Sequence, residues 1–140
     1  MTLADSIAAA LPGLRAEAES LMVDACTITR PGTGTGTVNE TTGEVTPPAP
    51  TTVYAGKCRV QRPGASTSQN STAGDYEIGV NTLLVQLPVT ALGVKRGDDF
   101  TLTAVGPLTD ADLLGSKAEV RANLAKTHAT KRTLICEEAN

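Results

Sequence analysis

The chain has 140 residues, a length that suits one compact domain with a single hydrophobic core. Aromatic residues make up only 2% of the chain and tryptophan is absent, so the core must be built from valine, leucine, isoleucine and alanine. The net charge of −3, from 12 basic and 15 acidic residues, argues against the dense basic surface of a sequence-specific nucleic-acid binder and leaves weak contact with a DNA backbone open.

Residues 1–22 are expected to form an N-terminal helical segment. Thr2 and Asp5 have the spacing of a capping box, which places the helix start near Leu3. Pro12 and Gly13 should break or kink the helix, giving two short helices or one bent helix. Its apolar residues recur every three or four positions, and this stripe either covers one end of the domain or docks on a neighbouring subunit: Leu3, Ile7, Ala10, Leu14, Ala18 and Leu21.

The same segment does not have the pattern of a targeting signal. It contains Asp5, lacks a positive leader and is interrupted by Pro12, which is atypical of signal peptides and membrane anchors. We therefore expect a protein that is made in cytoplasm and has no membrane partner.

Residues 23–138 are expected to form a mainly β domain of about six strands. The apolar period changes to two in VDACTITR, TVYAGKCRVQR, NTLLVQLPV, DDFTLTAV, KAEVRAN and KRTLICEE. Turns rich in Gly, Pro and Thr join them without intervening ten-residue helices, which predicts a small antiparallel β-barrel or sandwich. Phe100, Leu102 and Ala104 should share one face, and Thr109 should cap a single helical turn that ends at Gly115.

Two long loops should protrude from this domain. Residues 31–52 are expected to form an extended hairpin arm, in which Val38 and Val45 face each other, a Gly-Thr run acts as a hinge and prolines stiffen the return. Residues 62–76 are rich in Gly, Ser and Thr and should be flexible on their own, because they cannot bury enough apolar area to offset the entropy of ordering.

The residue types that usually carry catalysis are not combined into a site. His128 is the only histidine and is expected to be a solvent-facing turn residue. GTGTGT lacks the Gly-Lys-Ser/Thr ending of a phosphate loop, and Asp98 and Asp99 point to opposite strand faces, so they are interpreted as a polar strand start. We expect no enzyme, no cofactor and no metal site, and we expect Cys26, Cys58 and Cys136 to be reduced core residues.

Four stretches together resemble the small neck proteins of long-tailed actinobacteriophages, which are called head-closure, stopper or head-to-tail connector proteins. They are LRAEAESLMVDACTITRPGTGTG, TTGEVTPPAPTTVYAGKCRVQ, LLVQLPVTALGVKRGDDFTL and AKTHATKRTLICEE. In that family a strand, a G(V/I)xxGD turn and another strand recur, and residues 93–98 occupy that place here, with Gly97 supplying the free backbone.

The resemblance implies a small β-barrel that assembles as a ring, a dodecamer or hexamer, in the virion neck. Its partners would be portal or adaptor proteins on the head side and tail terminator or tail tube proteins on the tail side, with non-specific contact to packaged DNA. The ring would close the DNA-filled head and provide the tail docking surface, and no catalytic residue is carried over.

Candidate contact residues with DNA or neighbours are Val38, Val45, Lys57, Arg59, Lys95 and Arg96. For the four basic residues, solvated faces are the plain alternative. Because aromatic anchors are scarce, subunits would dock by adding a strand to a neighbouring sheet. Two other functions stay open: a tail-completion or terminator ring protein, and a monomeric β-barrel that binds a small ligand or nucleic acid.

Overall fold

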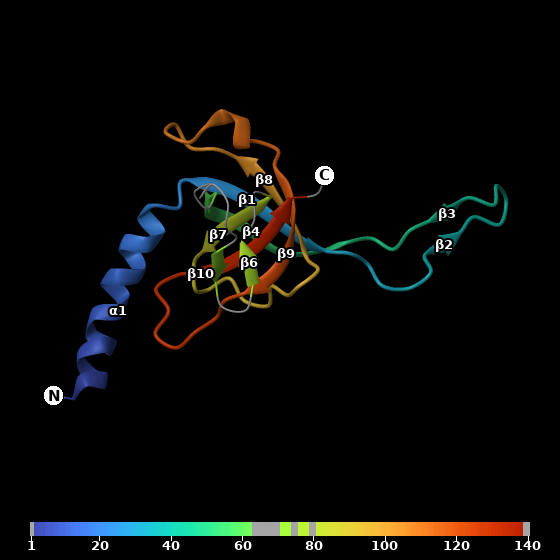
Figure 1. Ribbon diagram of the computed structural model, residues 1–140. Coiled ribbons are helices and arrows are strands. Elements are labelled where there is room, and N and C mark those ends of the chain that lie inside the picture. The colour runs from blue at the N-terminus through green and yellow to red at the C-terminus, as the bar shows by residue number, and fades with distance from the viewer. Residues whose placement is uncertain (1, 63–70, 74–75, 79–80, 139–140) are drawn as a thin grey trace.

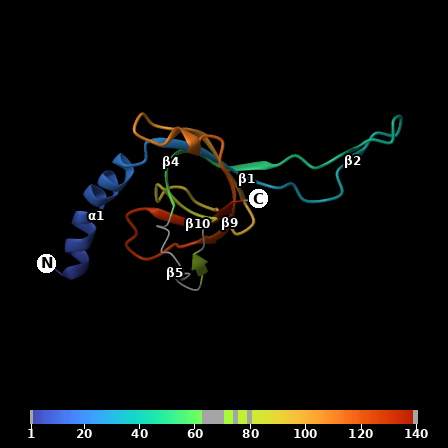
Figure 2. The ribbon, with the colours of Figure 1, turned by 45° about the horizontal axis from the view of Figure 1, so that its top comes forward.

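The computed structural model describes residues 2–62, 71–73, 76–78 and 81–138, and of 71–73 and 76–78 it describes only the backbone. Six antiparallel strands form a closed barrel, which confirms the predicted mainly β fold (Figure 1). The barrel closes because the strand Asp24–Arg30 pairs with Thr51–Gln61 on one side and with Asp99–Ala104, at the other end of the sheet, on the other (Figure 2). The strand order around it is β1 (Asp24–Arg30), β4 (Thr51–Gln61), β7 (Thr82–Leu87), β10 (Arg132–Glu138), β9 (Lys117–Asn123) and β8 (Asp99–Ala104).

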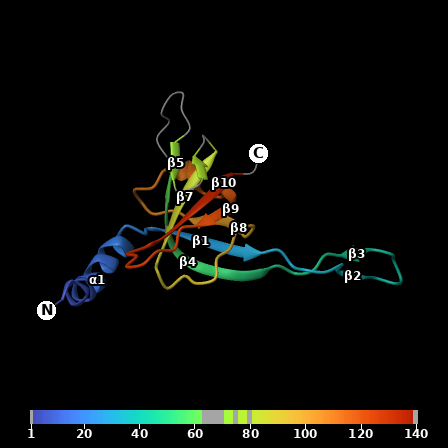
Figure 3. The same cartoon turned by 60° about the horizontal axis from the view of Figure 1, so that its bottom comes forward.

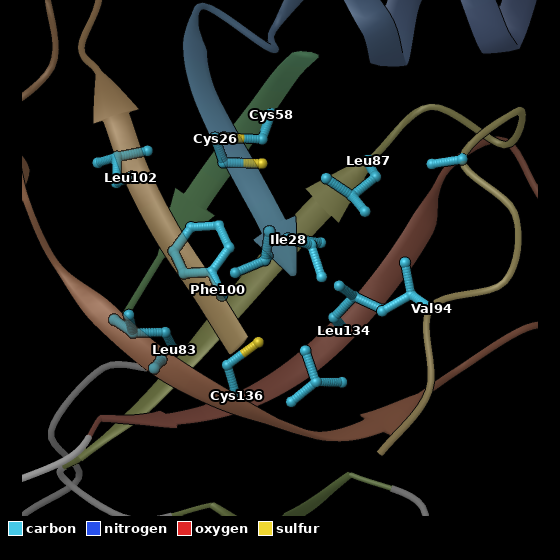
Figure 4. Packing of buried hydrophobic residues seen from close by; sticks show 14 residues of the cluster. Cys26, Ile28, Cys58, Leu83, Leu87, Val94, Phe100, Leu102, Leu134 and Cys136 are labelled. Atoms are coloured by element: carbon cyan, nitrogen blue, oxygen red, sulfur yellow. The ribbon is translucent and has the colours of Figure 1, made fainter. Parts of the chain in front are cut away.

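Alternate side chains of the barrel strands fill its interior (Figure 4). The alternation predicted from the sequence is observed on β7, where every second residue from Leu83 to Leu87 is completely buried. All three cysteines are buried and free, as expected. Ala104 does not share the buried face of Phe100 and Leu102, which corrects the prediction. It is exposed because β8 ends there and the chain leaves the barrel.

One helix, α1 (Leu3–Ser20), precedes the barrel and stands outside it (Figure 1). The capping box is present: the Asp5 amide donates to Thr2 Oγ1 at 3.2 Å, and the Thr2 amide donates to Asp5 Oδ2 at 3.0 Å. Pro12 lies inside a continuous helix, so the predicted alternative of two short helices is wrong. None of the residues of α1 is buried. Within the described ranges, no helix is long and apolar enough to cross a membrane.

The predicted helical turn is a 3₁₀ turn, η1 (Ala111–Leu113), between β8 and β9. Its cap is Asp110, whose carboxylate accepts from the Asp112 amide at 3.0 Å. Thr109 is therefore not the cap. Its hydroxyl donates instead to Asp24 Oδ1 at 2.6 Å, because the buried Asp24 carboxylate needs hydrogen-bond donors.

Two small hairpins complete the described structure. The first, β2 (Thr37–Val38) with β3 (Val45–Thr46), forms the tip of the arm. The second pairs β5 (Ser71–Ala73) with β6 (Tyr76–Ile78). The segment predicted to be a flexible loop, 62–76, lies mostly outside the described residues, so that prediction stays open there.

Candidate functional site

The arm formed by residues 31–50 is the most extended part of the molecule and leaves the barrel between β1 and β4 (Figure 3). At its tip Val38 pairs with Val45, the register predicted from the sequence. The turn between them is held by the Asn39 side chain, which accepts from the Thr41 amide at 2.9 Å. Val38 and Val45 are 58% and 57% exposed. The tip therefore presents two apolar side chains that the barrel does not cover.

The glycines of the arm allow its two strands to approach each other closely. A β-carbon on Gly32 would lie 2.7 Å from the carbonyl oxygen of Ala49, and one on Gly36 would overlap the carbonyl oxygen of Thr46. Gly36 also has a φ of 76°, a value that favours glycine. Since Gly32 and Gly36 both pack directly on the returning part of the arm, the Gly-Thr run allows the two sides of the arm to lie in close contact as well as allowing the chain to turn.

The base of the arm is fastened to the barrel by an ion pair that the sequence did not indicate. Asp98 was interpreted as part of a polar strand start, but its side chain is buried and contacts Arg30, the last residue of β1. The Asp98 carboxylate also accepts from the Lys95 amide at 2.8 Å. The hydrogen bond with Asp98 raises the pKa of Arg30. A buried carboxylate requires such partners. The ion pair therefore holds Arg30, the residue directly before the arm, against the turn at 93–98.

On the side of the barrel opposite the arm, α1 lies beside the segment that joins β9 to β10, residues 124–131 (Figures 1 and 3). Arg15 Nε donates to the carbonyl of Ala129 at 3.1 Å, which ties the helix to this segment. A cleft of about 300 Å³ opens at this junction. We call it the basic cleft, and its lining residues are Arg15, Val89, Ala125, Lys126, His128, Ala129, Lys131 and Arg132.

The charges that line the basic cleft are all of one sign. It has two arginines and two lysines, and none of its lining residues is acidic. Arg132 donates from Nη2 to the carbonyl of Val89 at 3.1 Å, whereas its Nε is buried without a hydrogen-bond partner in the described part of the chain. An unpaired buried donor is costly. Because its four cationic side chains are not balanced by an acidic lining residue, the cleft suits an anionic group.

The apolar stripe of α1 is largely uncovered. Leu3, Leu14 and Leu21 are 78%, 52% and 54% exposed, whereas Ile7 and Ala18 are partly buried. Of the two interpretations of this stripe, cover for the barrel fits only a minority of its residues. The greater part of the stripe lacks a partner within the described structure.

The four basic residues that were singled out in the sequence do not form one surface. Lys57 on β4 makes a 3.5 Å ion pair with Glu19 in the last turn of α1, and Arg59 follows it on the same strand, partly buried. Lys95 and Arg96 are exposed on the turn beside Arg30, at the other end of β1. The structure thus places Lys57 and Arg59 near the start of β1, where Lys57 pairs with Ala25, and Lys95 and Arg96 near its end.

The basic cleft was missed because Arg15 and Val89 are far in the sequence from its other lining residues. The stretch AKTHATKR, residues 125–132, contains six of its eight lining residues, and that local density of basic residues was the available signal. His128 is exposed in a turn with a φ of 56°, which confirms its predicted place. Arg15 could be added only from the folded chain.

The three thiols are poor nucleophiles in this structure. The hydrogen bond with Cys26, together with burial, raises the pKa of Cys58, and burial raises the pKa of Cys136 to about 12. Burial also raises the pKa of Tyr54 to about 12. Among the described residues, no three His, Cys, Asp or Glu side chains are grouped closely enough to hold a metal ion.

In a comparison with protein families, residues 14–137 match the family described as Family of unknown function (DUF6093). The comparisons with curated proteins and with solved structures give no match. The matched region runs from the middle of α1 to β10 and includes both the arm and the residues that line the basic cleft. Since it covers most of the 140 residues, the chain belongs to the DUF6093 family.

Proposed function

We propose that the protein is a structural subunit of a phage neck, whose copies form a ring that closes the DNA-filled head and provides the surface on which the tail docks. One observation carries this proposal. The arm and α1 project from opposite sides of a small closed barrel (Figures 1 and 3), and each exposes apolar side chains that the barrel does not cover.

Surfaces on opposite sides of a subunit support head-to-tail assembly. When two unlike surfaces of successive copies meet, the contacts either close into a ring or continue as a filament. In a monomer, Val38 and Val45 gain almost nothing from facing each other, since both stay more than half exposed. They gain apolar burial if a neighbouring copy covers the tip.

The resemblance of the sequence to head-closure proteins indicates where in the virion the ring would lie. The charge of the chain is consistent with that location. A ring through which DNA passes must release it, and each phosphate contact adds affinity. With a net charge of −3, the subunit would contact packaged DNA only weakly and without sequence preference. Portal or adaptor proteins on one side and tail terminator or tail tube proteins on the other would be its partners.

Labelling of purified virions tests the location. Antibodies against the protein are expected to bind at the neck in electron micrographs, and purified protein is expected to bind portal-adaptor complexes without any tail component present. Binding to tail tubes alone would favour a tail-completion or terminator ring. A monomer that joins neither particle would overturn the proposal and favour a ligand- or nucleic-acid-binding barrel.

Removal of the arm tests its role. Deleting residues 33–46 should leave a folded barrel, because in the described structure the arm tip contributes no residue to the hydrophobic core, but should block head closure. The control is Thr35→Ala with Thr41→Ala, which changes exposed arm residues without removing the hairpin. Normal infectious particles from the deletion would contradict the role proposed for the arm.

A further inference from the structure

We propose that the arm tip of one copy docks in the basic cleft of the next copy. This inference deepens the ring assembly of the proposed function and rests on it. It names the two surfaces that meet, the arm tip (residues 37–46) and the basic cleft, and it commits to a second copy of this chain as the occupant of the cleft.

The charges of the two surfaces are complementary. Residues 31–52 contain two charged residues, Glu40 and Glu44, and both are acidic and exposed. Neither takes part in an ion pair with a described residue. The basic cleft has four cationic side chains and none of its lining residues is acidic. Each surface therefore offers what the other lacks, and opposite charges of this kind steer and orient protein association.

The apolar parts of the two surfaces also correspond. Val38 and Val45 flank the acidic turn at the tip and are more than half exposed. The basic cleft includes Val89, Ala125 and Ala129 among its charged residues. An occupant of the cleft with carboxylates and short apolar side chains would match both features, whereas a bare phosphate would match the charge alone.

The arm cannot reach the basic cleft of its own subunit, because α1 and the segment 124–131, which supply most of the residues that line the cleft, lie on the side of the barrel opposite the arm (Figure 3). It is long enough to reach a neighbour. The eleven residues from Pro31 to Thr41 span at most about 35–40 Å when extended, more than the roughly 30 Å diameter of a small domain. The tight packing at Gly32 and Gly36 pre-orders the arm, which lowers the entropic cost of docking.

Charge reversal on each surface, and on both, tests the inference. One variant carries Glu40→Lys and Glu44→Lys, and a second carries Lys126→Glu and Lys131→Glu. Self-association of purified full-length protein is measured by sedimentation up to the solubility limit, in low and high salt. We expect each variant to associate at least about tenfold more weakly than the unchanged protein, because the first puts lysines opposite the cations of the cleft and the second removes the positive charge of the cleft as a whole. We expect salt to weaken the native association.

Restoration is the decisive result. A 1:1 mixture of the two variants should associate again, since the arm lysines of one variant then meet the cleft glutamates of the other while the native arm meets the native cleft. The chain with all four substitutions should associate by itself. Lys117→Glu, an exposed site outside the cleft, is the control and should leave association unchanged. Rescue by both routes excludes misfolding as the cause of the loss.

Three results would overturn the inference: a protein that stays monomeric at every concentration, association that neither reversal changes, or loss without restoration in the mixture. A different outcome would assign the cleft to phosphate binding and not to the arm. In that case a short DNA duplex or inorganic phosphate binds only when Lys126 and Lys131 are present, and the arm reversal has no effect on association. Absence of the protein from the virion neck would instead overturn the proposed function and leave a measured arm-to-cleft interface standing.

Discussion

Arg30 donates two hydrogen bonds to the carboxylate of Asp98, from Nε to Oδ1 at 2.9 Å and from Nη2 to Oδ2 at 3.0 Å. Arg30 Nη2 also donates to the carbonyl of Gly93 at 2.8 Å. The planar guanidinium matches a carboxylate in this geometry, which a lysine cannot reproduce. One side chain at the end of β1, directly before the arm, is thus joined to the turn before β8.

Removing the carboxylate should destabilise the barrel. Asp98→Ala leaves the Arg30 guanidinium and the Lys95 amide without their partner, and we expect the free energy of unfolding to fall by about 2 kcal/mol. Urea denaturation measures the change. The matched control is Asp99→Ala, the exposed neighbour, which should alter stability by less than about 0.5 kcal/mol. Equal effects of the two substitutions would show that the ion pair contributes little.

A side chain at Gly36 should open the arm without affecting the barrel. Gly36→Ala places a β-carbon against the Thr46 carbonyl and requires a strained positive φ. We expect the nuclear Overhauser contact between Val38 and Val45 to be lost while the melting temperature of the barrel stays unchanged. Thr35→Ala is the control and should keep that contact. Persistence of the contact in Gly36→Ala would mean that the arm adapts its path.

The cysteines should resist thiol reagents as long as the barrel is folded. Cys26, Cys58 and Cys136 are at most 1% exposed, and the raised pKa values of Cys58 and Cys136 suppress the reactive thiolate. We expect no reaction with a disulfide reagent at pH 8 in the native protein and reaction of all three in urea. Rapid labelling of any one in the native state would show that the barrel opens locally.

The start of α1 should depend on pH through Asp5. Its hydrogen bonds with Thr2 lower the pKa of the Asp5 carboxyl below the ordinary value of 3.8. A lowered pKa in the folded state means that the stabilisation is present above pH 3.8 and is lost as the pH falls through the lowered value. Amide chemical shifts of the first helical turn should report fraying below that pH.

Two variants separate this effect from general acid unfolding. Asp5→Asn should already show the frayed shifts at neutral pH and little further change in acid. Glu17→Gln, near the other end of the helix, should keep the acid transition of the first turn. An unaltered transition in Asp5→Asn would assign it to a different carboxyl group.

The helix start, the strands and their buried faces could be predicted because they depend on residues close together in the chain. Thr2 and Asp5 are three positions apart, and their capping box is observed. Val38 and Val45 are separated by one turn, and their pairing is observed. In each case the physical cause is local: a side chain satisfies a nearby amide, or the alternation of a strand directs every second residue inward.

Predictions failed where a distant residue decided the outcome. Asp98 looked like an exposed strand start, but Arg30, 68 positions away, allows its burial. Thr109 looked like a helix cap, but Asp24, 85 positions away, accepts a hydrogen bond from its hydroxyl. A polar side chain goes to the partner that compensates its burial, and that partner is known only once the barrel has closed.

The sequence by itself determined that this is a small β-domain with thiols in its core, a capped helix in front and a glycine- and proline-rich arm. Only the tertiary structure decided that the arm and the basic cleft lie on opposite sides of the barrel. Arg15 and Ala129 are 114 positions apart, and no local preference relates them. The pairing of β1 with both β4 and β8 closes the barrel, and this closure sets where α1, the arm and the segment 124–131 emerge.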